Sequence, residues 1–62
     1  MLKALKKRYE AQIAESEATL EIYLENSVGI GEHPQHIDEM DKLFDKISTA
    51  REKLKEVEKW MI

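Results

Sequence analysis

The second half of the chain carries an unbroken heptad of apolar residues. Side chains spaced by alternating steps of three and four return to one face of an α-helix and form a seam for another helix. Seven residues follow this spacing: Met40, Leu43, Ile47, Ala50, Leu54, Val57 and Met61. The first half has a weaker stripe, interrupted by Ser16 and Glu17, whose apolar members are Leu2, Leu5, Tyr9, Ile13, Leu20, Tyr23 and Leu24. The pattern predicts two amphipathic helices packed through these stripes.

Glycine and proline mark the connection between the two helices. Both glycines and the only proline lie between Gly29 and Pro34, with strong helix formers on either side. We expect a helix at about 2–26, a connection at about 27–33 and a helix at about 34–60, within one domain, 1–62. A short connection between long amphipathic helices gives an antiparallel hairpin, so the predicted class is all-α. Val28 and Ile30 are expected to cap the core.

The apolar face of the second helix is wider than one partner helix needs, because Ile37, Phe44 and Trp60 lie beside its seam. The core of such a small hairpin gives almost no net stability, and the chain has no cysteine for a disulfide. We therefore expect an antiparallel homodimer, a four-helix bundle. Its core and dimer seam are predicted to contain Tyr9, Ile13, Leu20, Leu24, Met40, Leu43, Phe44, Ile47, Leu54 and Val57.

Charge is distributed unevenly along the chain. The segment from Glu15 to Asp45 has nine acidic residues and one basic residue, Lys42, whereas residues 1–14 and 46–62 each have a basic excess. A hairpin would thus be acidic at its connected end and basic at its open end. Antiparallel packing of two hairpins brings opposite ends together, and such surface pairs select orientation more than they supply stability. The alternative is that the charges only keep the surface soluble and complement the helix dipoles.

Candidate chemistry is sparse. His33 and His36 could touch one metal ion, but the pair falls short of a zinc pattern. The favoured interpretation is that His33 shapes the helix entry and His36 faces solvent or the partner. The acidic run at 38–41 lacks the glycine and spacing of a calcium loop. The sequence has no Ser–His–Asp or Cys–His arrangement and no glycine-rich phosphate loop. We therefore expect no enzyme, cofactor, metal site or catalytic residue.

Composition also bounds the partners. The longest uncharged stretch, Asn26 to Gly31, is far too short to span a membrane, so we expect a cytoplasmic protein without a membrane partner. A basic patch at the open end could hold phosphates, but neighbouring glutamates and an antiparallel partner would neutralise it, which disfavours nucleic acid. Trp60 and Met61 are candidate contacts for a partner protein. The favoured alternative is that Trp60 folds back over Leu2 and Leu5.

Two likenesses extend this picture. The stretches Ala18–Leu24 and Val28–Pro34 resemble small helical proteins of T4-like marine phages, cyanophages in particular, and the similarity runs from about Tyr9 to Leu54. The resemblance implies an accessory phage protein in the cytoplasm of a bacterial host, with a host or phage protein as partner. It implies no activity or ligand. The expected architecture is also similar to that of Rop, a plasmid regulator whose hairpins dimerise antiparallel and bind RNA, although no sequence match accompanies this likeness.

Overall fold

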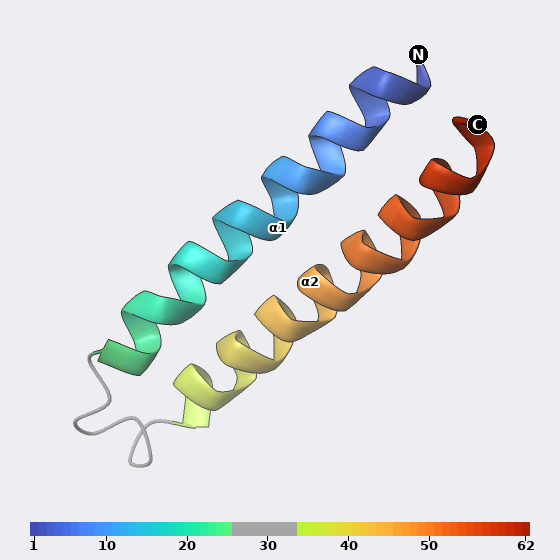
Figure 1. Cartoon of the computed structure of the whole chain (residues 1–62). Coiled ribbons are helices and arrows are strands. Elements are labelled where there is room, and N and C mark those ends of the chain that lie inside the picture. Colours follow the sequence, from blue (N-terminus) through green and yellow to red (C-terminus); the bar gives the residue numbers. More distant parts are fainter. Residues whose placement is uncertain (26–33) are drawn as a thin grey trace.

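The computed structural model describes residues 1–25 and 34–62, which form two helices. Helix α1 spans Leu2–Glu25 and helix α2 spans Pro34–Trp60. The helices lie side by side, and the two ends of the chain lie together at one end of the molecule (Figure 1). Ion pairs join Lys6 to Glu58 and Glu17 to Arg51, so the start of α1 lies beside the end of α2. The predicted all-α antiparallel hairpin is confirmed.

Local sequence explains where the helices begin and end. Helix α2 begins at Pro34, because a proline lacks the backbone N–H that the first helical position does not need. Helix α1 is described as far as Glu25, and its expected boundary at about residue 26 lies outside the described residues. The expectations for Val28, Ile30 and His33 lie outside the described residues.

The core lies between the two helices and is formed mainly by the heptad of α2. Leu20 of α1 packs with Leu43 and Ile47 of α2, and the half-buried Tyr23 and Met40 pack against this cluster. Ala50 and Val57 continue the buried row along α2. Tyr9, Ile13 and Leu54, which were also predicted in the seam, are half-buried. The heptad periodicity therefore located the face of α2 that contacts α1.

Small side chains occupy the middle of the contact between the helices. Ser16 of α1 is 6% exposed and Ala50 of α2 is 2% exposed, the lowest value in the core. Small residues allow helix axes to approach closely, since the side chains at the contact set the interaxial distance. Ser16, which the sequence presented as an interruption of the α1 stripe, is thus part of the packed face.

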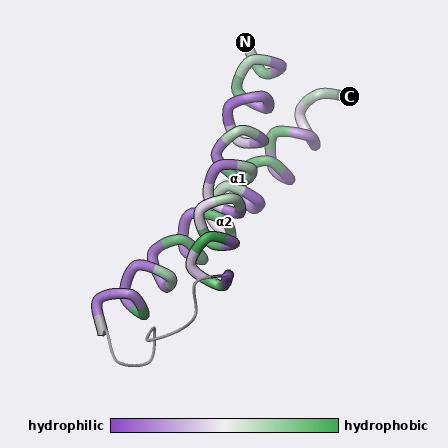
Figure 2. Tube along the Cα trace, turned by 90° about the vertical axis from the view of Figure 1, so that its left-hand side faces the viewer, coloured by the Kyte–Doolittle hydropathy of each residue, from purple (hydrophilic) through white to green (hydrophobic). Residues whose placement is uncertain are grey.

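The resulting molecule is a narrow rod with extents of 47 × 14 × 13 Å. Hydrophobic and hydrophilic stretches alternate along both helices (Figure 2). No large side chain in the described ranges is fully buried, because each helix has only one neighbour. Neither α1 nor α2 has a stretch that is both long and apolar enough to cross a membrane.

Candidate interaction surfaces

Two ion pairs define one of the long faces of the hairpin, which we call the ion-pair face. Arg51 Nη2 lies 2.7 Å from Glu17 Oε2, and Lys6 Nζ lies 3.6 Å from Glu58 Oε2. Arg51 and Glu58 are seven residues apart on α2, so they occupy nearly the same side of that helix. Both pairs therefore bridge the helices on this face.

Three large apolar side chains continue the same rows of residues. Leu24 lies seven residues after Glu17, and Phe44 lies seven residues before Arg51, with Ile37 seven residues before Phe44. Because the helices are antiparallel, both steps of seven move about 10 Å toward the end where α1 finishes and α2 starts. Leu24, Ile37 and Phe44, which we call the apolar patch, are 55%, 53% and 55% exposed.

The opposite face carries a polar groove, and we call it the groove face. At 100° per residue, the α1 residues of this groove lie on the side of the helix away from Glu17. The groove has a volume of about 560 Å³ and is lined by Gln12, Glu15, Ser16, Asp45, Lys46, Thr49, Ala50 and Lys53. A smaller hollow of about 260 Å³ continues it toward Tyr23 and Leu43. The groove is open to solvent along one side of the rod.

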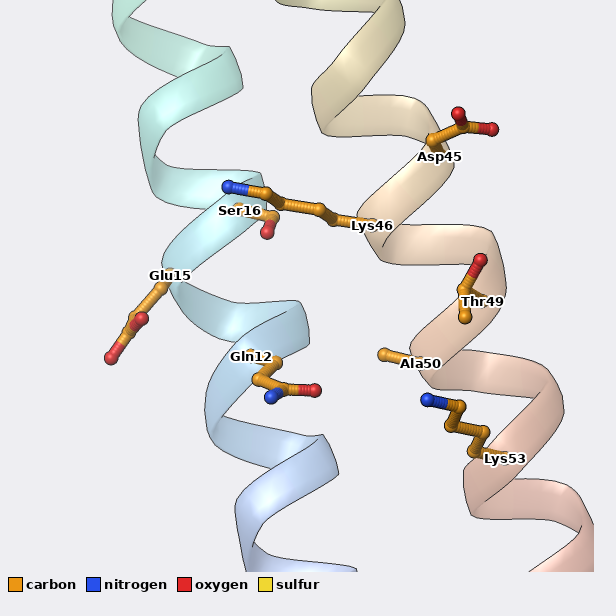
Figure 3. A pocket seen from close by; sticks show the side chains of 8 residues that line it. All are labelled: Gln12, Glu15, Ser16, Asp45, Lys46, Thr49, Ala50 and Lys53. Carbon is orange, nitrogen blue, oxygen red and sulfur yellow. The ribbon is translucent and has the colours of Figure 1, made fainter.

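The groove side chains place their donors inward and their carboxylates outward. Lys46 reaches from α2 toward Ser16, and Gln12 and Lys53 point toward each other, whereas Glu15 and Asp45 point away (Figure 3). Lys53 Nζ also lies 5.8 Å from the centre of the Tyr9 ring, a cation–π contact. This arrangement offers hydrogen-bond donors on an open surface. It does not exclude water, as a site for acid–base chemistry would.

His36 lies in the helix contact, which corrects the expectation that it faces solvent or a partner. The residue is half-buried, and its ring meets the Tyr23 ring edge-on with centroids 5.7 Å apart. The reason is its position, four residues before Met40 and seven before Leu43, which extends the seam of α2 by one turn. Within residues 1–25 and 34–62, no group of three or more His, Cys, Asp or Glu residues could hold a metal ion.

Trp60 does not fold back over Leu2 and Leu5, so this expectation was wrong. Its side chain is 73% exposed, and its Nε1 donates to Glu56 Oε2 at 3.1 Å. The heptad spacing puts Met61 four residues after Val57, and Trp60, one residue before Met61, is turned about 100° from that row. Met61 is 39% exposed. The role of both residues as partner contacts stays a prediction.

The predicted seam residues fall into two groups. All except Leu24 and Phe44 are buried or half-buried between α1 and α2, whereas these two are exposed on the ion-pair face. Their part in a dimer contact stays a prediction. Sequence reasoning missed the pairing of Glu17 with Arg51 and the groove. The sequence does contain a sign of the Glu17–Arg51 pair. Glu17 lies seven positions before Leu24 and Arg51 lies seven positions after Phe44, so both charged residues lie in rows beside the seam.

Comparisons with known proteins add no relative. No family model matches the chain, and no match was found among curated proteins or solved structures. The two faces are therefore interpreted from their geometry and chemistry alone.

Proposed function

We propose that this chain is a non-enzymatic helical hairpin that forms an antiparallel homodimer, a four-helix bundle, and acts as a protein-interaction module. The observation that carries the proposal is the apolar patch. Leu24, Ile37 and Phe44 are each more than half exposed on one face, while no large side chain in the described ranges is fully buried. Contiguous exposed apolar residues on a water-soluble chain mark interaction sites.

The energetic argument is that a second copy would remove the apolar patch from water. Fully burying one large apolar side chain contributes about 1.5–3 kcal/mol. The apolar patch therefore represents several kcal/mol of stabilisation that a single hairpin does not use. For a domain of this size, that amount is comparable with the whole free energy of unfolding.

The charge distribution supports the antiparallel orientation. Glu21, Glu25, Asp38 and Asp41 lie near the end where α1 finishes and α2 starts, which we call the acidic end. Lys3, Lys7, Lys55 and Lys59 lie near the opposite end, which we call the basic end. Two copies in opposite directions bring unlike ends together, whereas two copies in the same direction bring carboxylates together. Like charges in contact disfavour the second arrangement.

Nucleic-acid binding at the basic end is the alternative function. It is favoured by the basic excess there and by the analogy between the expected architecture and that of Rop. Ion pairs weaken it, because Lys6 contacts Glu58, Lys7 contacts Glu10 and Lys59 contacts Glu56. Titration with short RNA and DNA duplexes at low salt tests it, since phosphate contacts are strongest there. Absence of binding at low salt would remove this alternative.

The resemblance to phage proteins supports a role in the cytoplasm of an infected bacterium, where a host or phage protein would be the further partner. A tagged copy expressed during infection tests this role, with a Trp60→Ala copy as the control, because Trp60 is an exposed candidate partner contact. Capture of one protein by the natural hairpin and not by the control is the expected result. Equal capture by both copies would contradict a specific partner that binds through Trp60.

Sedimentation equilibrium over a range of concentrations tests the homodimer itself. The mass of one chain is 7.3 kDa. We expect the weight-average mass to rise with concentration to twice this value and then remain constant. A compact monomer that unfolds cooperatively and keeps the mass of one chain at every concentration would contradict the proposal.

A further inference from the structure

We infer that the second copy docks on the ion-pair face, with a two-fold axis that passes near Ala14 of α1 and Ser48 of α2. The inference rests on the proposed homodimer and adds which face it uses and which helices meet. It leaves the groove face of each copy pointing outward.

The two long faces differ in how readily they can lose water. The apolar patch lies on the ion-pair face, and three large apolar side chains there are more than half exposed. The groove face presents Glu15, Lys46 and Lys53 in and around its hollow. Burying charged groups without new partners costs free energy, whereas burying apolar groups releases it. The ion-pair face is therefore the favourable contact for a second copy.

Symmetry then decides which helices meet. When two hairpins pack face to face and run in opposite directions, the two-fold axis lies between the faces and perpendicular to the helices. Such an axis places α1 against α1 and α2 against α2, each pair antiparallel. In a parallel dimer, by contrast, α1 of one copy would lie against α2 of the other. The test of the antiparallel dimer is therefore whether the charges along each helix complement those of the same helix in the second copy, which runs in the opposite direction.

Helix α1 is complementary to its own reversed copy about Ala14. Lys7 lies seven residues before Ala14 and Glu21 lies seven residues after it. Lys3 and Glu25 lie eleven residues before and after it. The row of α1 that contains Ala14 consists of Lys7, Ala14 and Glu21. It lies on the outer side of the ion-pair face, beside the row of Lys3, Glu10 and Glu17, because each of its residues is four positions further along the helix. In an antiparallel pair centred on Ala14, each lysine meets a glutamate of the other copy.

Helix α2 shows the same property about Ser48. Asp41 and Lys55 lie seven residues before and after Ser48. The row of α2 that contains Ser48 consists of Asp41, Ser48 and Lys55. Each of these residues is four positions after a member of the row of Ile37, Phe44 and Arg51, so the Ser48 row flanks the row that carries the apolar patch. In an antiparallel pair centred on Ser48, carboxylates again meet basic groups.

The two centres lie close to the ion pair that joins α1 to α2. Ala14 lies three residues before Glu17 and Ser48 lies three residues before Arg51, so each is within about one turn of this ion pair. Because the helices are antiparallel, the two centres lie on opposite sides of the ion pair along the rod, and the axis passes between them. Both have small, exposed side chains that allow a second helix to approach. Glu17, three residues from Ala14, already has Arg51 as its partner.

Single-cysteine variants test the inference, because the sequence contains no cysteine. Ser48→Cys places a thiol beside the axis, so the two thiols of a dimer face each other. Thr49→Cys is the matched control, since Thr49 is exposed and lines the groove on the opposite face. With a short bismaleimide, we expect Ser48→Cys to form covalent dimers at least about tenfold faster than Thr49→Cys, because facing thiols have a high effective concentration. Ala14→Cys provides the same test on α1.

Each variant is also measured by circular dichroism and sedimentation equilibrium, so that folding and assembly are known. Dimers with fast linkage at positions 14 and 48 support the inference. Dimers that link faster at position 49 show that the copies meet through the groove face, and dimers that link at neither 14 nor 48 show a different orientation. Both results overturn this inference and leave the homodimer intact. Monomers at every concentration overturn the homodimer and the inference together.

Discussion

Arg51 of α2 donates a hydrogen bond from Nη2 to Oε2 of Glu17 on α1, at 2.7 Å, between residues that are 34 positions apart in the sequence. This contact marks the level of one helix against the other. Steps of seven residues from the two partners reach Leu24 and Phe44, so these two exposed apolar residues lie at about the same height on the same face.

The energy of this ion pair is expected to be small. In a single hairpin both side chains are about half exposed, so at dilutions where the chain is monomeric a double-mutant cycle with Glu17→Ala and Arg51→Ala should give a coupling of about 0.2–1 kcal/mol in the free energy of unfolding. This coupling should decrease as salt increases. The Glu39–Lys42 pair, which lies within α2, is the control for a local contact. A monomer coupling that does not change with salt would contradict this prediction, whereas loss of the salt dependence at concentrations where the dimer forms is expected if the second copy covers the ion-pair face.

Ile47→Asp is expected to unfold the hairpin. Ile47 is 4% exposed and lies in the cluster with Leu20 and Leu43, so the change places a carboxylate among apolar groups. The cost is expected to exceed about 4 kcal/mol, close to the whole stability of a small domain. Circular dichroism during urea unfolding measures it. Thr49→Asp, at an exposed position two residues away, is the control and should remain folded. A folded, dimeric Ile47→Asp variant would show that this seam is not central.

Phe44→Ala is expected to weaken self-association more than it affects the helical content. Phe44 is 55% exposed in a single hairpin, so truncating it leaves little cavity in the monomer. At an interface, loss of a buried aromatic anchor costs about 2 kcal/mol or more, which is roughly a thirtyfold increase in the dissociation constant. Sedimentation equilibrium measures the constant. Ile22→Ala is the control, because Ile22 is similarly exposed, at 59%, on the side of α1 away from α2. Equal effects of the two changes would argue against the ion-pair face as the dimer contact.

Charge reversal at position 7 tests the complementarity of α1 with its own copy. Lys7→Glu should weaken the dimer, because it places two carboxylates together wherever Lys7 meets Glu21 of the other copy. Glu21→Lys combined with Lys7→Glu should restore the affinity, since the pair is reversed and remains opposite in sign. Lys46→Glu, on the groove face, changes the net charge equally and is the control. If Lys46→Glu weakens the dimer as much as Lys7→Glu, net charge and not pairing controls assembly.

The sequence predicted the hairpin well because its strongest signals are geometric. Heptad spacing located the face of α2 that packs on α1, and Pro34 located the start of α2. The prediction for Trp60 is wrong because apolar character alone does not place a residue over the core, whereas its angle, about 100° from the row of Val57 and Met61, turns it toward solvent. The contact of Glu17 with Arg51 was harder to predict. It depends on the register of two helices, and the periodicity of one helix does not contain that register.

Residue type also misled the prediction at two kinds of position. Ser16 is polar and therefore looks like a break in the α1 stripe, but the tightest part of a helix contact requires small side chains. Leu24 and Phe44 are large and apolar, so they were assigned to the seam, but in one hairpin the positions beside the seam have no helix to cover them. The number of helices around an apolar residue decides its burial, and one chain's pattern does not state that number.

The hollow on the groove face has a consequence for valency. Because it lies on the side opposite the ion pairs, two hairpins joined through their ion-pair faces would present two identical hollows that open in opposite directions. A molecule that recognises one hollow would then find a second at the back of the same particle. Such a particle would bridge two ligands, as a double-sided connector does, and would not clamp a single ligand between its halves.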